Sequence, residues 1–189
     1  MYRIRQSECQ TEQTEKSGRK VQGELSRYTI HGKVHKFGDN VNTDYISPTP
    51  YLGMADEIMF EHAMGGVDPE FSKKVRPGDI IVAGKNFGSG SSRETAPFIL
   101  MGNGVSVIIA EFFARIFYRN AINIGLPVLT CKEVLQISDG DDLEVDPIAG
   151  VIHNVTKGEK YECSALPENI MEIVKDGGLI PHFRKNLPQ

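Results

Sequence analysis

The sequence predicts an α/β protein in which a parallel-rich sheet is flanked by helices and carries a small β extension. Three short apolar runs, at residues 80–83, 105–110 and 126–130, have the length and the β-branched content of buried strands. Segments with helical character separate them, at residues 92–101 and 111–122. Strands that are apolar throughout and alternate with helices are typical of a parallel sheet covered on both faces.

The first part of the chain contributes one further strand and a long connection. Residues 28–37 (YTIHGKVHKF) alternate and are rich in β-branched side chains, which predicts a strand. The turn-rich residues 38–50 predict a long loop. A short helix is possible at 55–64, before a Gly-Gly break, and Arg-Pro-Gly-Asp at 76–79 predicts a turn into the first apolar run.

The last part of the chain predicts the β extension and one more helix. Residues 142–161 combine short strand patterns with turns at Asp146-Pro147 and Lys157-Gly158. Residues 167–175 have helical character and are followed by a Gly-Gly pair that would end the helix.

Length and composition indicate an ordinary soluble domain. The 189 residues suffice for one core, which we assign to residues 28–189, while the polar residues 1–27 are expected to form a disordered extension. Hydrophobic residues make up 40% and charged residues 24% of the chain. The net charge of −4 offers no basic surface for nucleic acid, and no apolar run reaches the roughly 18 residues of a membrane span.

The cysteine and histidine residues do not form a recognisable metal motif. Cys9, Cys131 and Cys163 are odd in number and widely spaced, which favours a reducing cytoplasm over a disulfide framework. They cannot hold an iron–sulfur cluster by themselves, because such clusters usually take about four thiolates. Cys131 follows an apolar run and is expected to be a small core residue. His31 and His35 share a strand face but lack a third ligand nearby, so we expect no zinc site there.

The segment NFGSGSSRE, at residues 86–94, has the composition and the position of a ligand-binding loop. It leaves the end of a predicted parallel strand and enters a helix, where open α/β sheets bind ligands. Free N–H groups at a helix start favour an anion, and the glycines allow close approach to it. Arg93 adds a planar fork that suits a carboxylate. Ser91 to Glu94 also match S-x-x-E, the pattern of a capping box that would only start the helix. This segment alone leaves both a structural cap and an anion-binding loop open.

Familiar glycine-rich motifs do not fit the segment. A dinucleotide fingerprint requires a third glycine where Arg93 stands, and a P-loop requires Ser or Thr where Asn86 stands. The hydrolase elbow G-x-S-x-G is absent, because Ser89 lies directly between two glycines. What remains is an anion site with hydroxyl groups attached.

Three segments in order carry a resemblance to a known family. GDNVNTDYI at 38–46, GKNFGSGSSRE at 84–94 and AEFFARIFYRNAINIGLP at 110–127 resemble the swivel domain of the aconitase superfamily, and the similarity extends over about residues 29–178. The separately encoded form of this domain is the small subunit of 3-isopropylmalate dehydratases and homoaconitases. The resemblance implies a hydro-lyase subunit that isomerises 2-isopropylmalate and 3-isopropylmalate in leucine biosynthesis and is inactive without an iron–sulfur large subunit.

The resemblance also implies roles for four residues. Ser91 matches the catalytic serine, which as an alkoxide takes a proton from the carbon next to a substrate carboxylate. Ser92 matches a hydrogen-bonding serine, Arg93 an arginine that grips a substrate carboxylate, and Asp44 an acidic residue at the edge of the site. The resemblance further implies that the large-subunit partner carries a [4Fe–4S] cluster that would accept the departing hydroxide, and that this chain itself binds no metal.

A serine can act as a base only in a special environment. A serine hydroxyl is a weaker acid than tyrosine, whose pKa is about 10, so a downward shift of about 3–5 units would leave it mostly protonated at neutral pH. Backbone N–H groups and arginine must stabilise the alkoxide, and water must be excluded. The glycine-to-helix turn is expected to supply this environment.

The segment after Asp44 bears on the choice of substrate. Homoaconitase-type small subunits carry Tyr-Leu-Arg where this chain has Tyr-Leu-Gly at 51–53, so an arginine for an extra carboxylate is missing. Leu52, Gly53 and Met54 therefore favour a branched alkyl group, at about 0.8 kcal/mol per buried methylene. Compensation by Arg76 or by the large subunit, a dimethylmalate-type substrate, and a simple packing role for Leu52 and Met54 stay open.

A different class of function is also compatible with the sequence. The same loop could belong to a carboxylate- or phosphate-binding module that regulates a partner without catalysis. Arg115 and Arg119, four apart on one predicted helix, would face the site or the partner, or lie in solvent.

Overall fold

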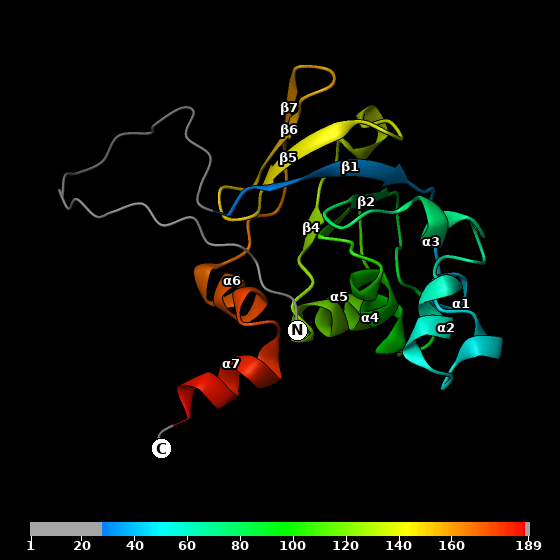
Figure 1. Cartoon of the computed structure of the whole chain (residues 1–189). Helices are drawn as coiled ribbons and strands as arrows, with labels where there is room; N and C mark the ends of the chain where they lie inside the picture. Colours follow the sequence, from blue (N-terminus) through cyan, green and yellow to red (C-terminus); the bar gives the residue numbers. More distant parts are fainter. Residues whose placement is uncertain (1–27, 188–189) are drawn as a thin grey trace.

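A computed structural model describes residues 28–187, and its centre is one seven-stranded sheet (Figure 1). The strand order is β4-β3-β2-β1-β5-β6-β7, with β1 shared by a parallel half and an antiparallel half. The parallel strands are β1 (Ile30–Lys36), β2 (Ile80–Ala83), β3 (Val107–Ala110) and β4 (Val128–Thr130). The antiparallel strands are β5 (Asp142–Asp146), β6 (Val151–Asn154) and β7 (Glu159–Glu162).

The apolar runs form the parallel half, as predicted. Every residue of β2 and β3 is buried, so both faces of these strands are covered. β2 and β3 pair in register from Ile80 with Val107 to Ala83 with Ala110, and β4 continues this register. Because the strands are parallel and in register, their carboxyl ends meet at one edge of the sheet. The predicted α/β class with a small β extension is confirmed.

Seven helices and two 3₁₀ turns surround the sheet in the described part of the chain. α4, α5 and α6 lie on one side of it in Figure 1. The helices are α1 (Thr43–Ile46), α2 (Asp56–Glu61), α3 (Phe71–Lys74), α4 (Thr95–Gly102), α5 (Arg115–Asn123), α6 (Glu168–Lys175) and α7 (Leu179–Asn186). The turns are η1 (Thr49–Tyr51) and η2 (Val134–Gln136).

Two predictions about the connections need correction. Residues 38–50 are not one long loop, because they contain α1 and the start of η1. The Asn42 side chain accepts a hydrogen bond from the Tyr45 N–H at 2.9 Å and caps α1, a local signal that the turn-rich composition concealed. Helix α7 was not predicted. Gly177, with φ +83°, follows the end of α6, and Gly178, with φ +112°, is the N-cap from which α7 begins.

Both helices of the parallel half begin later than the sequence indicated. α4 begins at Thr95 because the preceding loop stays irregular, and α5 begins at Arg115 because residues 111–114 first continue along the sheet. The predicted extension at residues 1–27 lies outside the described residues. Within residues 28–187, no helix has the length and apolarity needed to cross a membrane.

Buried aromatic rings join the parallel strands to the helices. Phe87 is fully buried and contacts Phe117 of α5 edge to face, with ring centroids 5.2 Å apart.

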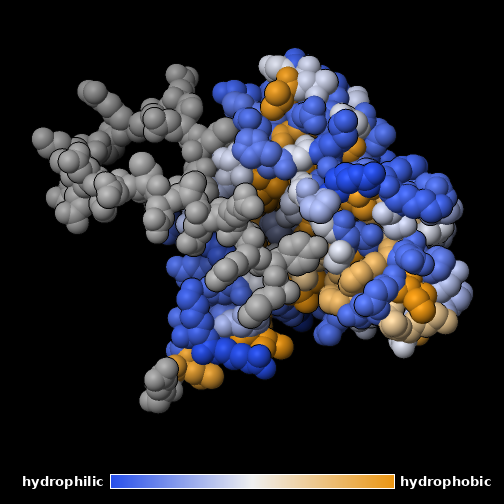
Figure 2. Space-filling view, in the orientation of Figure 1, coloured by the Kyte–Doolittle hydropathy of each residue, from blue (hydrophilic) through white to orange (hydrophobic). Residues whose placement is uncertain are grey.

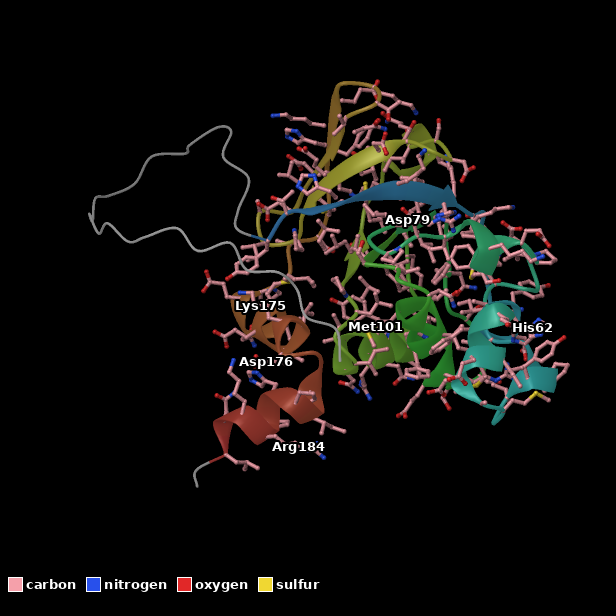
Figure 3. All side chains as sticks on the ribbon, viewed as in Figure 1. His62, Asp79, Met101, Lys175, Asp176 and Arg184 are labelled. Carbon is pink, nitrogen blue, oxygen red and sulfur yellow. The ribbon has the colours of Figure 1, made fainter. Side chains whose placement is uncertain are left out.

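Cys131 is 2% exposed, which confirms its expected place in the core, and burial raises the pKa of its thiol to about 11. His35 of β1 lies 2.7 Å from the Asp79 carboxylate, a pair that ties β1 to the turn before β2; Asp79 is labelled in Figure 3.

Candidate active site at the carboxyl ends of the parallel strands

Three chain segments extend the sheet beyond the carboxyl ends of its parallel strands. Asn42, after β1, forms a parallel bridge with Ser89, after β2, and Phe87 forms one with Phe113, after β3. The Gly88 N–H donates to the Val41 carbonyl at 2.7 Å, which fixes the loop 84–94 against the segment after β1. The motif segments at 38–46, 84–94 and 110–127 therefore lie side by side at one edge.

Glycine is required at the centre of this loop. Gly88 has φ +74° and Gly90 has φ +100°, a backbone region that side chains disfavour. A Cβ atom at Gly88 would stand 2.2 Å from the Phe117 ring, so only glycine lets the loop pack directly on α5. The loop therefore holds its position through close packing, and the serines that follow are presented from a fixed backbone.

Ser91 and Ser92 are exposed and do not form a capping box. Helix α4 begins at Thr95, and the Glu94 side chain makes no capping hydrogen bond. The Ser91 carbonyl accepts hydrogen bonds from the Arg93 N–H at 2.8 Å and from the Thr43 hydroxyl at 3.3 Å. Within residues 28–187 neither serine hydroxyl has a hydrogen-bond partner. The geometry thus leaves both hydroxyls available to a ligand or another chain.

Arg93 is paired with Asp44, which lies 49 residues earlier in the sequence. Arg93 Nη2 lies 2.6 Å from the Asp44 carboxylate and donates to the Thr49 hydroxyl at 3.1 Å, while Nη1 donates to the Ser47 carbonyl at 3.1 Å. The Thr49 hydroxyl in turn donates to Asp44 at 2.9 Å. The Arg93 side chain is 18% exposed and that of Asp44 is 49% exposed. The structure thus brings together two residues that the sequence placed in separate motifs.

These contacts change the electrostatics of Asp44. The hydrogen bond from Thr49 and the hydrogen bond and charge of Arg93 hold the pKa of Asp44 below its usual range. Asp44 therefore stays ionised and orients the guanidinium. Arginine has five N–H donors, and the three contacts leave Nε–H and one Nη1–H for another ligand. The Arg93 guanidinium, which was expected to be open to a substrate carboxylate, is therefore already bound on one side by Asp44.

The segment 51–54 lies next to this network through Thr49. Leu52 is half-buried, whereas Gly53 and Met54 are exposed, Met54 by 46%. Gly53 has φ +78°, and a Cβ atom there would meet no atom of the described chain within 4 Å. Space for a longer side chain exists at this position, but the backbone conformation favours glycine.

Sequence reasoning missed the partners that hold this region in place. The rings of Tyr51 and His62 are stacked, with centroids 3.5 Å apart, and line a cavity of about 270 Å³ (His62 is labelled in Figure 3). Thr49 and the Ser47 carbonyl, which hold Arg93, were missed as well. A hydroxyl or carbonyl that binds a distant side chain leaves no pattern in the sequence.

The described part of the chain offers no metal site. Among residues 28–187 no three His, Cys, Asp or Glu side chains converge as ligands would. Cys163, like Cys131, is a free thiol, and burial is the main cause that raises its pKa to about 12. Both thiols therefore stay neutral, in contrast to thiolate ligands. Cys9 lies outside the described residues.

Comparison with known proteins identifies the class to which this fold and site belong. The family model of the aconitase C-terminal domain matches residues 6–134. The chain therefore belongs to the aconitase C-terminal domain family.

Individual members of this family are similar to the chain over most of its length. The isopropylmalate/citramalate isomerase small subunit of Methanocaldococcus jannaschii is 53% identical over 86% of this chain and 98% of its own length. The 3-isopropylmalate dehydratase small subunit of Methanosarcina acetivorans is 53% identical over 82% of this chain and 97% of its own. A crystal structure of 3-isopropylmalate dehydratase from Methanocaldococcus jannaschii matches with a TM-score of 0.80 and 43% identity, covering 84% of this chain and 95% of that one.

Proposed function

We propose that the chain is the small subunit of a 3-isopropylmalate dehydratase. This hydro-lyase isomerises 2-isopropylmalate and 3-isopropylmalate by dehydration and rehydration, a step of leucine biosynthesis. Two relatives that share about half of their residues with the chain over more than four-fifths of its length are named 3-isopropylmalate dehydratase small subunit. The structural observation that carries the proposal is the exposed Ser91 hydroxyl, unpartnered among residues 28–187 and presented two residues before the Asp44-bound Arg93.

In the proposed reaction, Ser91 moves the proton. Its alkoxide removes hydrogen from the carbon next to a substrate carboxylate and returns hydrogen in the reverse step. Arg93 binds that carboxylate through the donors that Asp44, Ser47 and Thr49 do not use, and its charge stabilises the alkoxide. Asp44 fixes the guanidinium in place, and Ser92 donates a hydrogen bond to the bound substrate.

A large-subunit partner completes the site. Ser91 lies at the surface, where water would keep its hydroxyl protonated, so a second chain must cover it. We propose that the large subunit carries a [4Fe–4S] cluster, which would supply the Lewis acid for the departing hydroxide. We place the cluster on the partner, and the lack of a convergent ligand set among residues 28–187 is compatible with this assignment. Each chain alone is then half of an active site.

The segment 51–54 favours a substrate with a small alkyl group. Leu52 and Met54 contribute apolar surface beside Thr49, and Gly53 provides no cation for a third carboxylate. A homocitrate-type substrate is therefore disfavoured. The relative named for isopropylmalate and citramalate makes a malate with a smaller alkyl group a second candidate, and 2,3-dimethylmalate belongs to the same chemical class.

The test is reconstitution with a purified large subunit. Isopropylmalate, citramalate, dimethylmalate and homocitrate are assayed side by side on each chain alone and on the mixture. We expect turnover only in the mixture, fastest with isopropylmalate and lowest with homocitrate. Anion binding by this chain without turnover in any mixture would support the regulatory module instead and contradict the proposal.

A further inference from the structure

Exposed apolar side chains lie on both flanks of the serine loop. On one flank, Phe112 is 55% exposed and Ile116 is 50% exposed, four residues apart. On the other flank, Tyr45 of α1 is 42% exposed. Large apolar side chains are normal on a surface when they are scattered singly, whereas a group around one functional loop indicates an interaction surface.

Backbone hydrogen bonds place this group directly beside the serine loop. The Phe87 N–H donates to the Phe112 carbonyl at 3.0 Å, and the Ala114 N–H donates to the Phe87 carbonyl at 2.9 Å. Phe112 therefore lies about one strand spacing, roughly 5 Å, from the backbone of the loop that carries Ser91. On the other flank, Tyr45 follows Asn42, which is bridged to Ser89.

Basic side chains lie near Phe112 and next to Ile116 in the sequence. Lys85 and Lys132 line, with Phe112, an open cavity of about 520 Å³, and Arg115 is exposed on α5 beside Ile116. Glu111, 3.5 Å from Lys85, offsets one of these charges. The whole chain carries a net charge of −4, so this flank is more basic than the average surface.

A second apolar stripe lies elsewhere on the molecule. On α7 and its C-cap residue, Ile180, Phe183 and Leu187 are 64%, 57% and 64% exposed, and Figure 2 shows hydrophobic surface at this end. Helix α7 starts next to the far end of α5, where Gly178 packs against the Asn123 carbonyl. Because α5 has nine residues, its two ends are about 13 Å apart. The serine loop contacts the near end of α5 through Phe117, whereas α7 begins at the opposite end of that helix.

We propose that Phe112 and Ile116, together with Tyr45, form the surface on which the large subunit docks, and that the α7 stripe lies outside it. This inference rests on the proposed function, which requires a second chain to cover Ser91. A stable interface buries about 800 Å² on each partner, or about 20–30 residues. A footprint of that size centred on Ser91 includes Phe112, one strand spacing from the loop. The partner surface is apolar at its centre with an acidic rim.

The test compares two phenylalanines of nearly equal exposure. Phe112→Asp and Phe183→Asp make the same change at 55% and 57% exposed positions, and Ser91→Ala removes the proposed base only. The Kd for the purified large subunit is measured by calorimetry for each variant. We expect Phe112→Asp to weaken binding by about tenfold or more, as for a central interface residue. Phe183→Asp should stay within about twofold and Ser91→Ala should bind normally.

Folding and self-association are controlled in the same experiment. Circular dichroism and thermal melting should be the same for both Asp variants, and Ile116→Glu provides a second probe if Phe112→Asp melts early. Sedimentation of this chain alone shows whether either variant breaks contacts between copies of it. Loss of self-association in Phe112→Asp, with unchanged affinity for the large subunit, would assign the surface to a second copy and overturn the proposal.

The remaining outcomes separate the docking surface from the function. Unchanged binding by both Phe112→Asp and Ile116→Glu, or a large loss for Phe183→Asp alone, overturns the docking surface while the enzyme assignment stands. A wild-type chain that neither binds the large subunit nor supports turnover overturns the proposed function and the surface with it.

Discussion

Polar side chains have opposite environments in the two halves of the sheet. In the antiparallel half, Asp141 is 5% exposed and accepts hydrogen bonds from the Ser138 N–H at 2.8 Å and the Asn154 amide at 2.7 Å. Lys157 lies 3.2 Å from the same carboxylate. At the carboxyl edge of the parallel half, the Ser91 hydroxyl is exposed and has no partner among residues 28–187.

This difference separates polar groups that stabilise the fold from those available for chemistry. A buried polar group that lost its partner would cost about 1–3 kcal/mol, so the Asp141 network must be satisfied for the extension to fold. An exposed serine hydroxyl contributes almost nothing to stability, because water satisfies it equally well. Substitution of buried polar residues in the antiparallel half should therefore lower the free energy of unfolding, whereas substitution of those in the serine loop should lower kcat.

The largest expected effect is on catalysis. Ser91→Ala should lower kcat of the reconstituted enzyme by about 10²–10⁴-fold, the contribution of a positioned base. Its melting temperature should match that of the wild type. Ser138→Ala, at an exposed serine of the antiparallel half, is the matched control and should keep full kcat. Undiminished turnover by Ser91→Ala would remove Ser91 from the mechanism.

Asn154→Leu should have the converse effect. It removes the amide that donates to the buried Asp141 carboxylate and should lower the free energy of unfolding by about 1–3 kcal/mol. The kcat per folded molecule should not change. Urea denaturation followed by circular dichroism measures the first quantity and the reconstituted assay the second. Equal stability of variant and wild type would mean that the network is not a stabilising feature.

Arg93→Lys tests whether the guanidinium binds substrate or only joins Asp44 to Thr49. Lysine keeps the charge but loses the planar fork, so we expect KM for the substrate to rise about tenfold, equivalent to about 1.4 kcal/mol. Steady-state kinetics on the mixture provides the measurement. Asp44→Asn, which leaves the fork intact but less firmly held, should raise KM by less. A fall in melting temperature with unchanged KM would make Arg93 a purely structural residue.

The smallest expected effect is on the melting temperature at low pH, and it also differs between the two halves of the sheet. Burial opposes ionisation of Asp141, but hydrogen bonds from Ser138, Asn154 and Lys157 prevail and lower its pKa. A lowered folded-state pKa gives stability that is present above the unfolded value of about 3.9 and is lost as pH falls through the folded value. We therefore expect a flat melting temperature from pH 7 to about 5 and a steep decline below about 4.

Two variants assign this acid dependence. Asp141→Asn should melt earlier at pH 7 and lose part of the decline, because the group responsible no longer titrates. Asp44→Asn should change the profile very little, since the carboxylate is half-exposed and solvent screens its pairing with Arg93. Thermal melting at pH steps of one unit is sufficient. A larger change for Asp44→Asn than for Asp141→Asn would reverse the comparison.

Local patterns accounted for much of the fold. The apolar residues 80–83 predicted β2 to the residue, α6 fell within its predicted segment, and the β5–β7 extension ran only one residue past the predicted end at 161. Such elements can be predicted because burial of an unbroken apolar run depends on the run itself. Helix starts were less accurate: residues 92–94 remain loop, and the apparent capping box at Ser91 and Glu94 does not form.

The sequence by itself determined a parallel sheet, a glycine-hinged loop at its carboxyl edge and the residue types of an anion site. The tertiary structure decided which of those residues are held by hydrogen bonds from other segments and which are left exposed. Arg93 meets Asp44 and Thr49 only because β1 and β2 are adjacent and parallel, which brings together segments more than 40 residues apart. Hydrogen bonds between distant segments depend on that placement, and so no local pattern could reveal that Ser91 is left exposed while Arg93 is held.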